Sequence, residues 1–195
     1  LLNQPDIDEV TIVPTYNHCT KENLSNYNHR CQMLSRAFQQ NTNINISVIE
    51  KILAEQYAYT ESRTHDTIRH LQKNNPTHKY HLAMGSDLFN TFTTWHNLSA
   101  YVDVPIKMIL REGYKVEQSN QLGIEELGIK FTIINPEMPI SNISSTAIKQ
   151  KIVRGESIRG IVPHSVIVYI YTHKDLLDSL KINPNDAYVL NYLAY

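Results

Sequence analysis

Three hydroxyl side chains and one lysine stand close together in the sequence and could bind a phosphate: Ser144, Ser145, Thr146 and Lys149. The pattern predicts a helix from about Ser145 to Arg154, with Ser144 as its N-cap. The unpaired N–H groups at such a helix start, together with the helix dipole, attract anions. A lysine this early opposes the dipole at a cost of roughly 0.3–1 kcal/mol, which a bound anion would offset. The alternative is a plain N-cap followed by a surface lysine.

A second candidate site follows residues 81–84, an apolar run that predicts a buried strand. Gly85 permits a ligand to approach the backbone closely. Asp87 can accept hydrogen bonds from two ribose hydroxyl groups, although it could equally cap the helix that follows. The two residues therefore predict either a nucleoside site or an ordinary helix start.

Trp95 is the only tryptophan of the chain. It shares a helical spacing with Leu88 and Phe92, which predicts one continuous helix and favours core packing for the indole ring. The flat face of the indole is also suited to stacking on an electron-poor ring. Both interpretations stay open at this point.

Four further polar residues follow strands or begin helices. Arg111 ends the predicted strand 106–110 and either faces a nucleotide or pairs with a carboxylate. Thr64 and Thr67 lie at the start of a predicted helix, where a capping role is as well supported as a ligand contact. Lys21 follows the first predicted strand and could reach a phosphate, although a lone loop lysine is usually solvated.

The elements that must position these residues alternate along the chain. Strands are predicted at 10–13, 81–84, 106–110 and 131–134, all as buried strands. Helices are predicted at 29–39 and 64–71, the second beginning with a capping threonine, and a proline-opened helix at 162–170. This alternation predicts an α/β fold with a parallel, doubly wound sheet, whose ligands bind beyond the carboxyl ends of the strands. We expect one domain over residues 1–176 and a tail of unknown role over residues 177–195, either a closing helix or a homo-oligomer contact.

The composition excludes several classes of protein. A formal net charge of −1 gives no general positive field for coating nucleic acid. No apolar run approaches the ~20 residues of a membrane-spanning helix. The two cysteines lack CxxC spacing, and the close histidine pairs, 65 with 70 and 78 with 81, lack the HxxxH spacing of a zinc site. We therefore expect a cytoplasmic protein without a metal site made by its own side chains.

The serine-rich helix start resembles a known signature. Residues 143–149 are similar to the SSTxIR motif of nicotinate and nicotinamide mononucleotide adenylyltransferases, with lysine in place of the usual arginine. Residues 155–158, 162–166 and 169–170 resemble the closing segment of the bacterial nicotinate-nucleotide enzymes. Gly85-Ser86-Asp87, followed by Trp95, is similar to the GxD…W element of the same family. The resemblance covers roughly residues 1–176.

Two weaker matches lie earlier in the chain. Lys21 with His29-Arg30 is similar to the HK…HR element of the family, with threonine where its first histidine falls. From the residues themselves, His29 and Arg30 are expected to anchor their helix. Residues 62–68 resemble the SYTxDTL element, with arginine at the position where tyrosine is common.

The resemblance implies adenylyl transfer from ATP to nicotinate mononucleotide, forming deamido-NAD and pyrophosphate, with Mg²⁺ bound through the substrate phosphates. It implies an ATP site at Gly85, Asp87, Ser144, Ser145, Thr146 and Lys149. It implies a mononucleotide site at Lys21, Thr64, Thr67, Trp95 and Arg111. The family's catalytic HxGH element is not in this sequence, and we expect it upstream of Leu1, because an alternating fold needs an earlier strand and helix.

Two alternatives accompany this interpretation. One is another small-molecule nucleotidyltransferase, of the phosphopantetheine adenylyltransferase type. The other is a non-catalytic protein that binds nucleotides. The residues themselves do not distinguish nicotinate from nicotinamide mononucleotide, since a few backbone groups could decide between a carboxylate and an amide.

Overall fold

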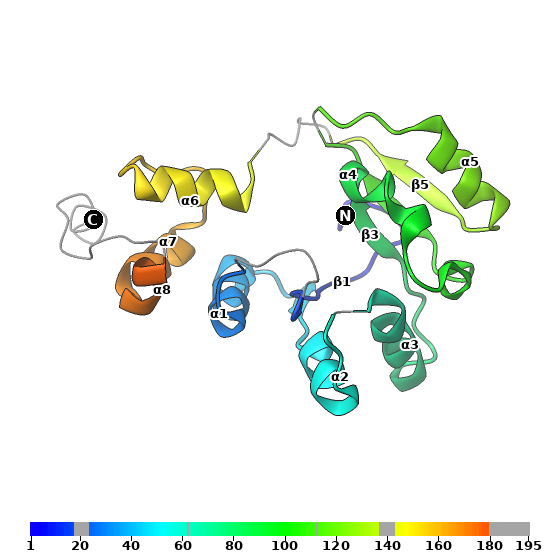
Figure 1. Cartoon of the computed structure of the whole chain (residues 1–195), viewed down its shortest axis with the longest axis horizontal. Coiled ribbons are helices and arrows are strands. Elements are labelled where there is room, and N and C mark those ends of the chain that lie inside the picture. The colour runs from blue at the N-terminus through cyan, green and yellow to red at the C-terminus, as the bar shows by residue number, and fades with distance from the viewer. Residues whose placement is uncertain (18–23, 62, 112, 137–142, 180–195) are drawn as a thin grey trace. The chain divides into compact units, whose positions relative to one another are not determined.

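Parallel strands form the framework of this protein, shown as a computed structural model in Figure 1. The structure describes residues 1–195 except 18–23, 62, 112, 137–142 and 180–195. β1 (Val10–Ile12) pairs with β2 (Ile44–Ile46), and a second sheet has the order β3-β4-β5. The bounds of this second sheet are Leu82–Gly85 for β3, Ile106–Ile109 for β4 and Phe131–Ile134 for β5. All these pairings are parallel, which confirms the α/β prediction.

The predicted strands are confirmed to within one residue at each end, but β2 was not predicted. Its three residues alternate as Ile44-Asn45-Ile46, which is too short a run for a reliable period. The prediction that all four strands are buried is wrong for β1 and β5, whose residues are only partly buried or exposed, and for most of β3, where only Met84 is buried. β4 matches it best, because it lies between two neighbouring strands.

The described chain divides into two compact units. The first joins Leu1–Ser62 with Ser144–Tyr195 and contains the sheet β1-β2, whereas the second is the continuous segment Arg63–Ile143 and contains the sheet β3-β4-β5. The domain of residues 1–176 stays a prediction, and most of its tail, residues 180–195, lies outside the described residues.

The first unit is built mainly from helices. They are α1 (Tyr27–Phe38), α2 (Ile49–Tyr57), α6 (Ser145–Val153), α7 (His164–Thr172) and α8 (Lys174–Ser179). α1 packs against α7, and α7 packs against α8. The core of this unit contains Ile152, Ile167 and Leu177, with Met33 and Ala37 of α1 packed against it. The predicted apolar side of the helix around residues 29–39 therefore faces this core.

Local sequence explains where these helices begin. Asn26 caps α1 by accepting a hydrogen bond from the Asn28 N–H, and α7 follows Pro163, whose φ of −54° suits the entry to a helix. No helix in the described part of the chain has both the length and the apolar character that a membrane crossing requires.

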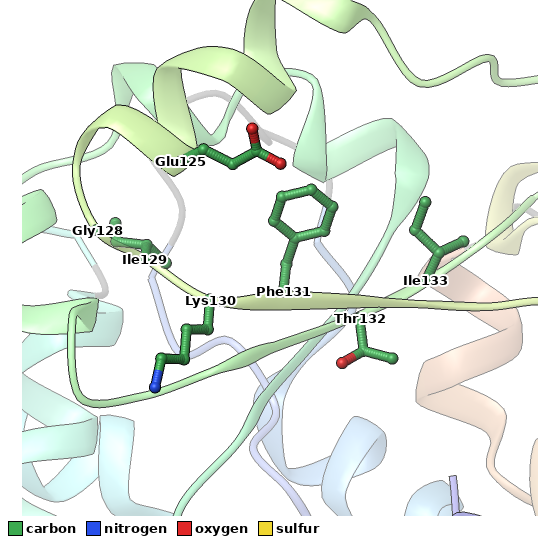
Figure 2. A pocket seen from close by; sticks show the side chains of 7 residues that line it. All are labelled: Glu125, Gly128, Ile129, Lys130, Phe131, Thr132 and Ile133. Carbon is green, nitrogen blue, oxygen red and sulfur yellow. The ribbon is translucent and has the colours of Figure 1, made fainter.

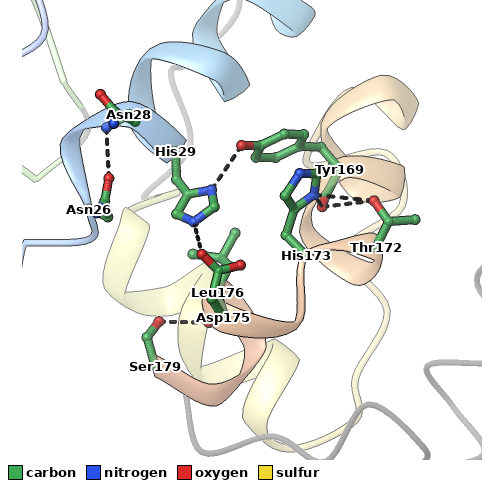
Figure 3. A network of polar contacts seen from close by, with 9 residues as sticks. All are labelled: Asn26, Asn28, His29, Tyr169, Thr172, His173, Asp175, Leu176 and Ser179. Atoms are coloured by element: carbon green, nitrogen blue, oxygen red, sulfur yellow. Dashed lines mark hydrogen bonds and ion pairs between the residues drawn. The ribbon is translucent and has the colours of Figure 1, made fainter.

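His29 and Arg30 anchor α1, as predicted. Arg30 donates hydrogen bonds to the backbone oxygens of Ser25 and Thr15, at 3.0 and 2.7 Å. The His29 ring lies between α7 and α8, with Nδ1 2.8 Å from the Tyr169 hydroxyl and Nε2 2.6 Å from Asp175 Oδ2 (Figure 3). Because a carboxylate can only accept, Nε2 carries the proton of that bond.

This contact makes a pH-dependent contribution to stability. The hydrogen bond from His29 lowers the pKa of Asp175, so its contribution is present above the unfolded pKa of about 3.9 and is lost as the pH falls through the lower, folded value. We expect Asp175→Asn to lose the stabilisation seen at pH 6 and to match the wild type more closely near pH 2. Thermal unfolding between pH 2 and pH 7 measures this difference. Asp178→Asn, an exposed position in the same helix, is the control; an equal effect there would contradict the assignment.

The second unit surrounds its sheet with short helices. They are α3 (Thr64–Asn74), α4 (Ser86–Phe89), η1 (Phe92–Thr94), η2 (Leu98–Tyr101) and α5 (Gln118–Glu126). The core contains Ile106 and Met108 of β4 together with Phe89, Phe92 and Ile124, all fully buried. This core supports the ends of β3 and β4, where the predicted site residues lie.

One predicted helix in this unit is wrong. The stripe of Leu88, Phe92 and Trp95 does not lie on one helix, because α4 ends at Phe89 and the 3-10 helix η1 follows. Leu88 is 48% exposed, whereas Phe92 is completely buried. The hydroxyls of Thr91 and Thr94 donate to backbone oxygens three residues earlier, at 3.0 and 2.7 Å. Such local bonds compete with α-helical geometry and favour a tighter turn.

Candidate functional site

The carboxyl ends of β3 and β4 bring an aspartate and an arginine together. Arg111 Nη1 lies 2.7 Å from Asp87 Oδ2, and each side chain is slightly more than a quarter exposed. The guanidinium carbon of Arg111 also lies 5.6 Å from the centre of the Tyr114 ring. Of the two roles left open for Arg111, pairing with a carboxylate is therefore observed. The pair presents both a cation and a carboxylate at the edge of the sheet where α/β proteins bind ligands.

Gly85 leaves room for the Asp87–Arg111 pair. A Cβ atom on Gly85 would lie 2.3 Å from Asp87 Oδ1 and 3.0 Å from Arg111 Cδ. The backbone of Gly85, at φ −77° and ψ 158°, is one that any residue adopts. Glycine is therefore suited to this position because it has no side chain. Asp87 and Arg111 occupy the space that a side chain would fill.

Asp87 lies inside α4 and does not cap it. α4 begins after Gly85 and no side chain caps it, so the capping alternative for Asp87 is wrong. The carboxylate accepts a hydrogen bond from Arg111 instead, because a guanidinium forms a stronger, charge-assisted hydrogen bond than a backbone N–H does.

Ser86 is a residue of this site that the sequence patterns missed. Its side chain is completely buried, and its Oγ accepts a hydrogen bond from the Arg111 backbone N–H at 3.1 Å. The sequence offered one indication of this role, a small polar residue between Gly85 and Asp87. The partner lies 25 positions away, so only the pairing of β3 with β4 reveals it.

The start of α3 contains the two predicted threonine contacts. Neither caps the helix: Arg63 is the N-cap residue and no side chain caps α3, so the capping prediction for Thr64 is wrong. Thr67 is 5% exposed, and in the described part of the chain its hydroxyl has no hydrogen-bond partner. A buried hydroxyl without a partner carries a desolvation cost that a bound ligand would relieve. Since helical side chains tilt toward the N-terminus, Thr67 leans toward the start of α3.

A histidine beside these threonines has a lowered pKa. Burial lowers the pKa of His65, and the positive charges of Arg69, Arg63 and His96 lower it further, against the opposing effect of Asp66. The His65 ring lies 3.4 Å from the Asp66 carboxylate. Two arginines and a second histidine thus act electrostatically on the His65 ring.

Trp95 packs on the core of the second unit. Its ring centre lies 5.2 Å from that of Phe92 and 6.3 Å from that of Tyr101, and the indole is partly buried. Core packing, one of the two predicted roles, is therefore observed. Burial also raises the pKa of Tyr101 to about 12, so its hydroxyl stays protonated under this aromatic cluster.

The predicted helix with the serine-rich start is confirmed as α6. The Ala147 N–H donates to Ser144 Oγ at 3.1 Å, which makes Ser144 the N-cap. Gly155 ends the helix with a φ of 69°, a conformation that favours glycine. Ser145 and Thr146 are exposed, and Lys149 is half-buried one turn later. Ser144, Ser145 and Thr146 at this helix start are thus all exposed.

The predicted site residues fall into two groups. Gly85, Asp87 and Arg111 meet in the second unit, which also contains Thr64, Thr67 and Trp95, whereas Ser144, Ser145, Thr146 and Lys149 belong to the first unit. Lys21 lies outside the described residues. The proposed roles of these residues in binding nucleotides stay predictions.

A hollow of about 720 Å³ is lined by residues of β5 and of the segment before it (Figure 2). Its lining residues are Glu125, Gly128, Ile129, Lys130, Phe131, Thr132 and Ile133. None of them is a predicted site residue. Among the residues that the structure describes, no three His, Cys, Asp or Glu side chains gather as a metal site.

Comparison with known proteins identifies the relatives of this chain. Residues 2–151 match the model of the family described as cytidylyltransferase-like. A protein of Enterococcus faecalis named probable nicotinate-nucleotide adenylyltransferase is 31% identical over 183 residues, covering 91% of this chain and 76% of that protein. A Clostridium tetani protein of the same name is 28% identical over 170 residues, covering 83% and 80%.

Solved structures share the fold. The nicotinic acid mononucleotide adenylyltransferase of Plasmodium falciparum, complexed with NaAD, superposes with a TM-score of 0.72 at 18% identity, covering 93% of this chain and 86% of that one. The same enzyme complexed with APC gives a TM-score of 0.69. The fold is therefore of the Rossmann type, with parallel sheets and flanking helices.

Proposed function

Since the chain belongs to the cytidylyltransferase-like family, we propose that it transfers the adenylyl group of ATP to nicotinate mononucleotide. The relatives named nicotinate-nucleotide adenylyltransferase support this activity. The structural observation that best supports this activity is the Asp87–Arg111 pair at the carboxyl ends of adjacent parallel strands. A carboxylate there can accept hydrogen bonds from sugar hydroxyls, and the guanidinium can meet a phosphate.

The reaction joins two anionic substrates without a covalent enzyme intermediate. A phosphate oxygen of the mononucleotide attacks the α-phosphorus of ATP, and the bond from that phosphorus to the oxygen bridging the β-phosphate breaks. Pyrophosphate leaves with the electron pair, and deamido-NAD forms. The protein must align the two substrates and stabilise the charge that develops on the phosphate oxygens. Mg²⁺ enters as part of the ATP substrate, held by the phosphates.

The proposed ATP contacts are those that the family resemblance implies. Gly85 and Asp87 receive the ribose, and the start of α6 receives the phosphates through its exposed hydroxyls and first N–H groups. The accessible helix start supports this role, since a helix of nine residues has the dipole and the unpaired donors that bind phosphate. Lys149 adds a full positive charge one turn into α6.

The mononucleotide is proposed to contact the start of α3, with Trp95 and Arg111 as further contacts. The buried Thr67 hydroxyl without a partner among the described residues supports a polar ligand there. The basic groups around His65 support an anionic one. The preference for nicotinate over nicotinamide mononucleotide is proposed from the names of the relatives.

The test is turnover by the protein expressed from its intact gene, supplied with ATP, Mg²⁺ and nicotinate mononucleotide. We expect one pyrophosphate for each dinucleotide formed, and a higher kcat/KM with nicotinate than with nicotinamide mononucleotide. Calorimetric binding of ATP without pyrophosphate release would point to the non-catalytic alternative. Transfer to 4′-phosphopantetheine in preference to the mononucleotide would point to the other nucleotidyltransferase type.

Lys149 provides a sharper test of the α6 site. We expect Lys149→Gln to lower kcat/KM for ATP by about tenfold or more, because a charged hydrogen bond to phosphate is lost. Lys151→Gln is the matched control on the same helix, since Lys151 pairs with Glu156 at 2.9 Å, and it should stay within about twofold of wild type. Steady-state kinetics with varied ATP measures both. Equal losses in the two variants would contradict a phosphate role for Lys149.

A further inference from the structure

Two side chains next to the candidate site hold the segment that leads from β4 to α5. Ser86 and Asn90 lie four positions apart, at the start of α4 and just after its end. Ser86 Oγ accepts a hydrogen bond from the Arg111 N–H at 3.1 Å, at the beginning of this segment. Near its end, Asn90 Nδ2 donates to the Lys115 backbone oxygen at 2.7 Å and Asn90 Oδ1 accepts from the Glu117 N–H at 3.1 Å. The described residues of this segment are therefore bonded to Ser86 and Asn90 near both of its ends.

The hydrogen bonds of both side chains described above go to residues outside α4. Serine and asparagine commonly bond to nearby backbone groups, as Thr91 does when it donates to the Leu88 oxygen at 3.0 Å. Ser86 and Asn90 instead reach backbone groups 25 to 27 positions away. The nitrogen of the Asn90 amide donates to one backbone group of this segment, and the oxygen accepts from another. Both ends of the amide are therefore needed.

The bond to Ser86 adds to the pairing of β3 with β4 in setting where Arg111 lies. The bond to Ser86 holds the Arg111 backbone, and from there the side chain passes Gly85 to reach Asp87. A shift of the Arg111 backbone would therefore move the guanidinium and release the Asp87 carboxylate. Preorganised charges of this kind work only when they are held close to their productive positions.

From these contacts we infer that Ser86 and Asn90 are positioning residues of the adenylyl-transfer reaction, which hold Arg111, and through it Asp87, in place for the nucleotides. This inference rests on the proposed function. Ser86 acts on Arg111 directly through its backbone, and Asn90 acts by fixing the far end of the same segment. Neither residue is assigned a contact with a substrate.

Kinetics of single and double variants test the inference. We expect Ser86→Ala to raise KM for the mononucleotide by about tenfold, with a smaller change in kcat, and Asn90→Ala to raise it less. In an Arg111→Ala background, Ser86→Ala should have no further effect, because it acts through Arg111. Thr91→Ala, which removes only a local bond, is the control and should match wild type. Equal losses from Ser86→Ala with and without Arg111 would overturn the inference.

Limited proteolysis separates this inference from the proposed function. Loosening the segment should raise the rate of tryptic cleavage after Arg111 and Lys115 by about tenfold in Ser86→Ala and Asn90→Ala, but not in Thr91→Ala. If the wild type does not turn over while this pattern holds, the proposed function fails and the two-point attachment stands. If the wild type turns over and both variants match it in KM and in cleavage, the inference fails and the function stands. Should Ser86→Ala not fold, the more exposed Asn90→Ala carries both measurements.

Discussion

Replacing Gly85 by alanine is expected to lower kcat/KM for adenylyl transfer by roughly a hundredfold, because a displacement of about 1 Å at a reacting site has an effect of that size. The new Cβ would lie 2.3 Å from Asp87 Oδ1 and 3.0 Å from Arg111 Cδ, so the ion pair must move. The backbone itself is not strained by alanine, since its φ is −77°. Steady-state kinetics, together with a thermal unfolding curve that shows the variant to be folded, measures the effect.

Gly123→Ala is the matched control for this experiment. Gly123 lies inside α5, and its added Cβ would meet only Thr93 Cγ2, at 3.4 Å. Alanine there should raise the free energy of unfolding by about 0.5–1 kcal/mol, through its higher helix propensity, and leave the kinetics unchanged. Full activity of Gly85→Ala would show that the arrangement of Asp87 and Arg111 is not needed for catalysis.

Phe92→Ala is expected to have the largest effect on stability, lowering the free energy of unfolding by about 3–5 kcal/mol. Phe92 is completely buried, with its ring centre 5.2 Å from that of Trp95 and 5.1 Å from that of Tyr101. Removing the ring leaves a cavity beneath both neighbours. Urea unfolding followed by fluorescence measures the loss, and Trp95, the single tryptophan, reports on this unit.

Leu88→Ala is the comparison that makes this prediction specific. If residues 88–95 formed one helix with a buried stripe, Leu88 and Phe92 would both be core residues. In the structure Leu88 is 48% exposed, so its replacement should cost less than about 1 kcal/mol. A Leu88→Ala variant as unstable as Phe92→Ala would favour the continuous helix over the observed break at Asn90.

The sequence by itself determined the features that depend on neighbouring residues. β-branched and apolar runs located four of the strands, and their alternation with helices identified the parallel α/β fold. Ser144 and Gly155 marked the two ends of α6, because a cap and a left-handed terminating residue act within one helical turn. The motif resemblances identified the family, since those motifs are contiguous in the chain.

The local pattern failed where local signals were ambiguous. Thr64 is a good capping residue, yet Arg63 occupies the N-cap position of α3. A helical period fits Leu88, Phe92 and Trp95, yet the chain changes from α4 to η1 between the first two. Threonine hydroxyls bonded to the backbone accompany this change. In neither place does residue type alone decide where a helix begins or ends.

Only the tertiary structure decided how the candidate site is assembled. Asp87 and Arg111 are 24 positions apart, and Ser86 and Arg111 are 25 apart, so no periodicity connects them. They meet because β3 and β4 pair in parallel, with Gly85 opposite Ile109, which brings both carboxyl ends to one edge. Burial of the Thr67 hydroxyl and of Phe92 is likewise set by what packs against them. The sequence specified the residue types, and the pairing of distant strands specified which of them touch.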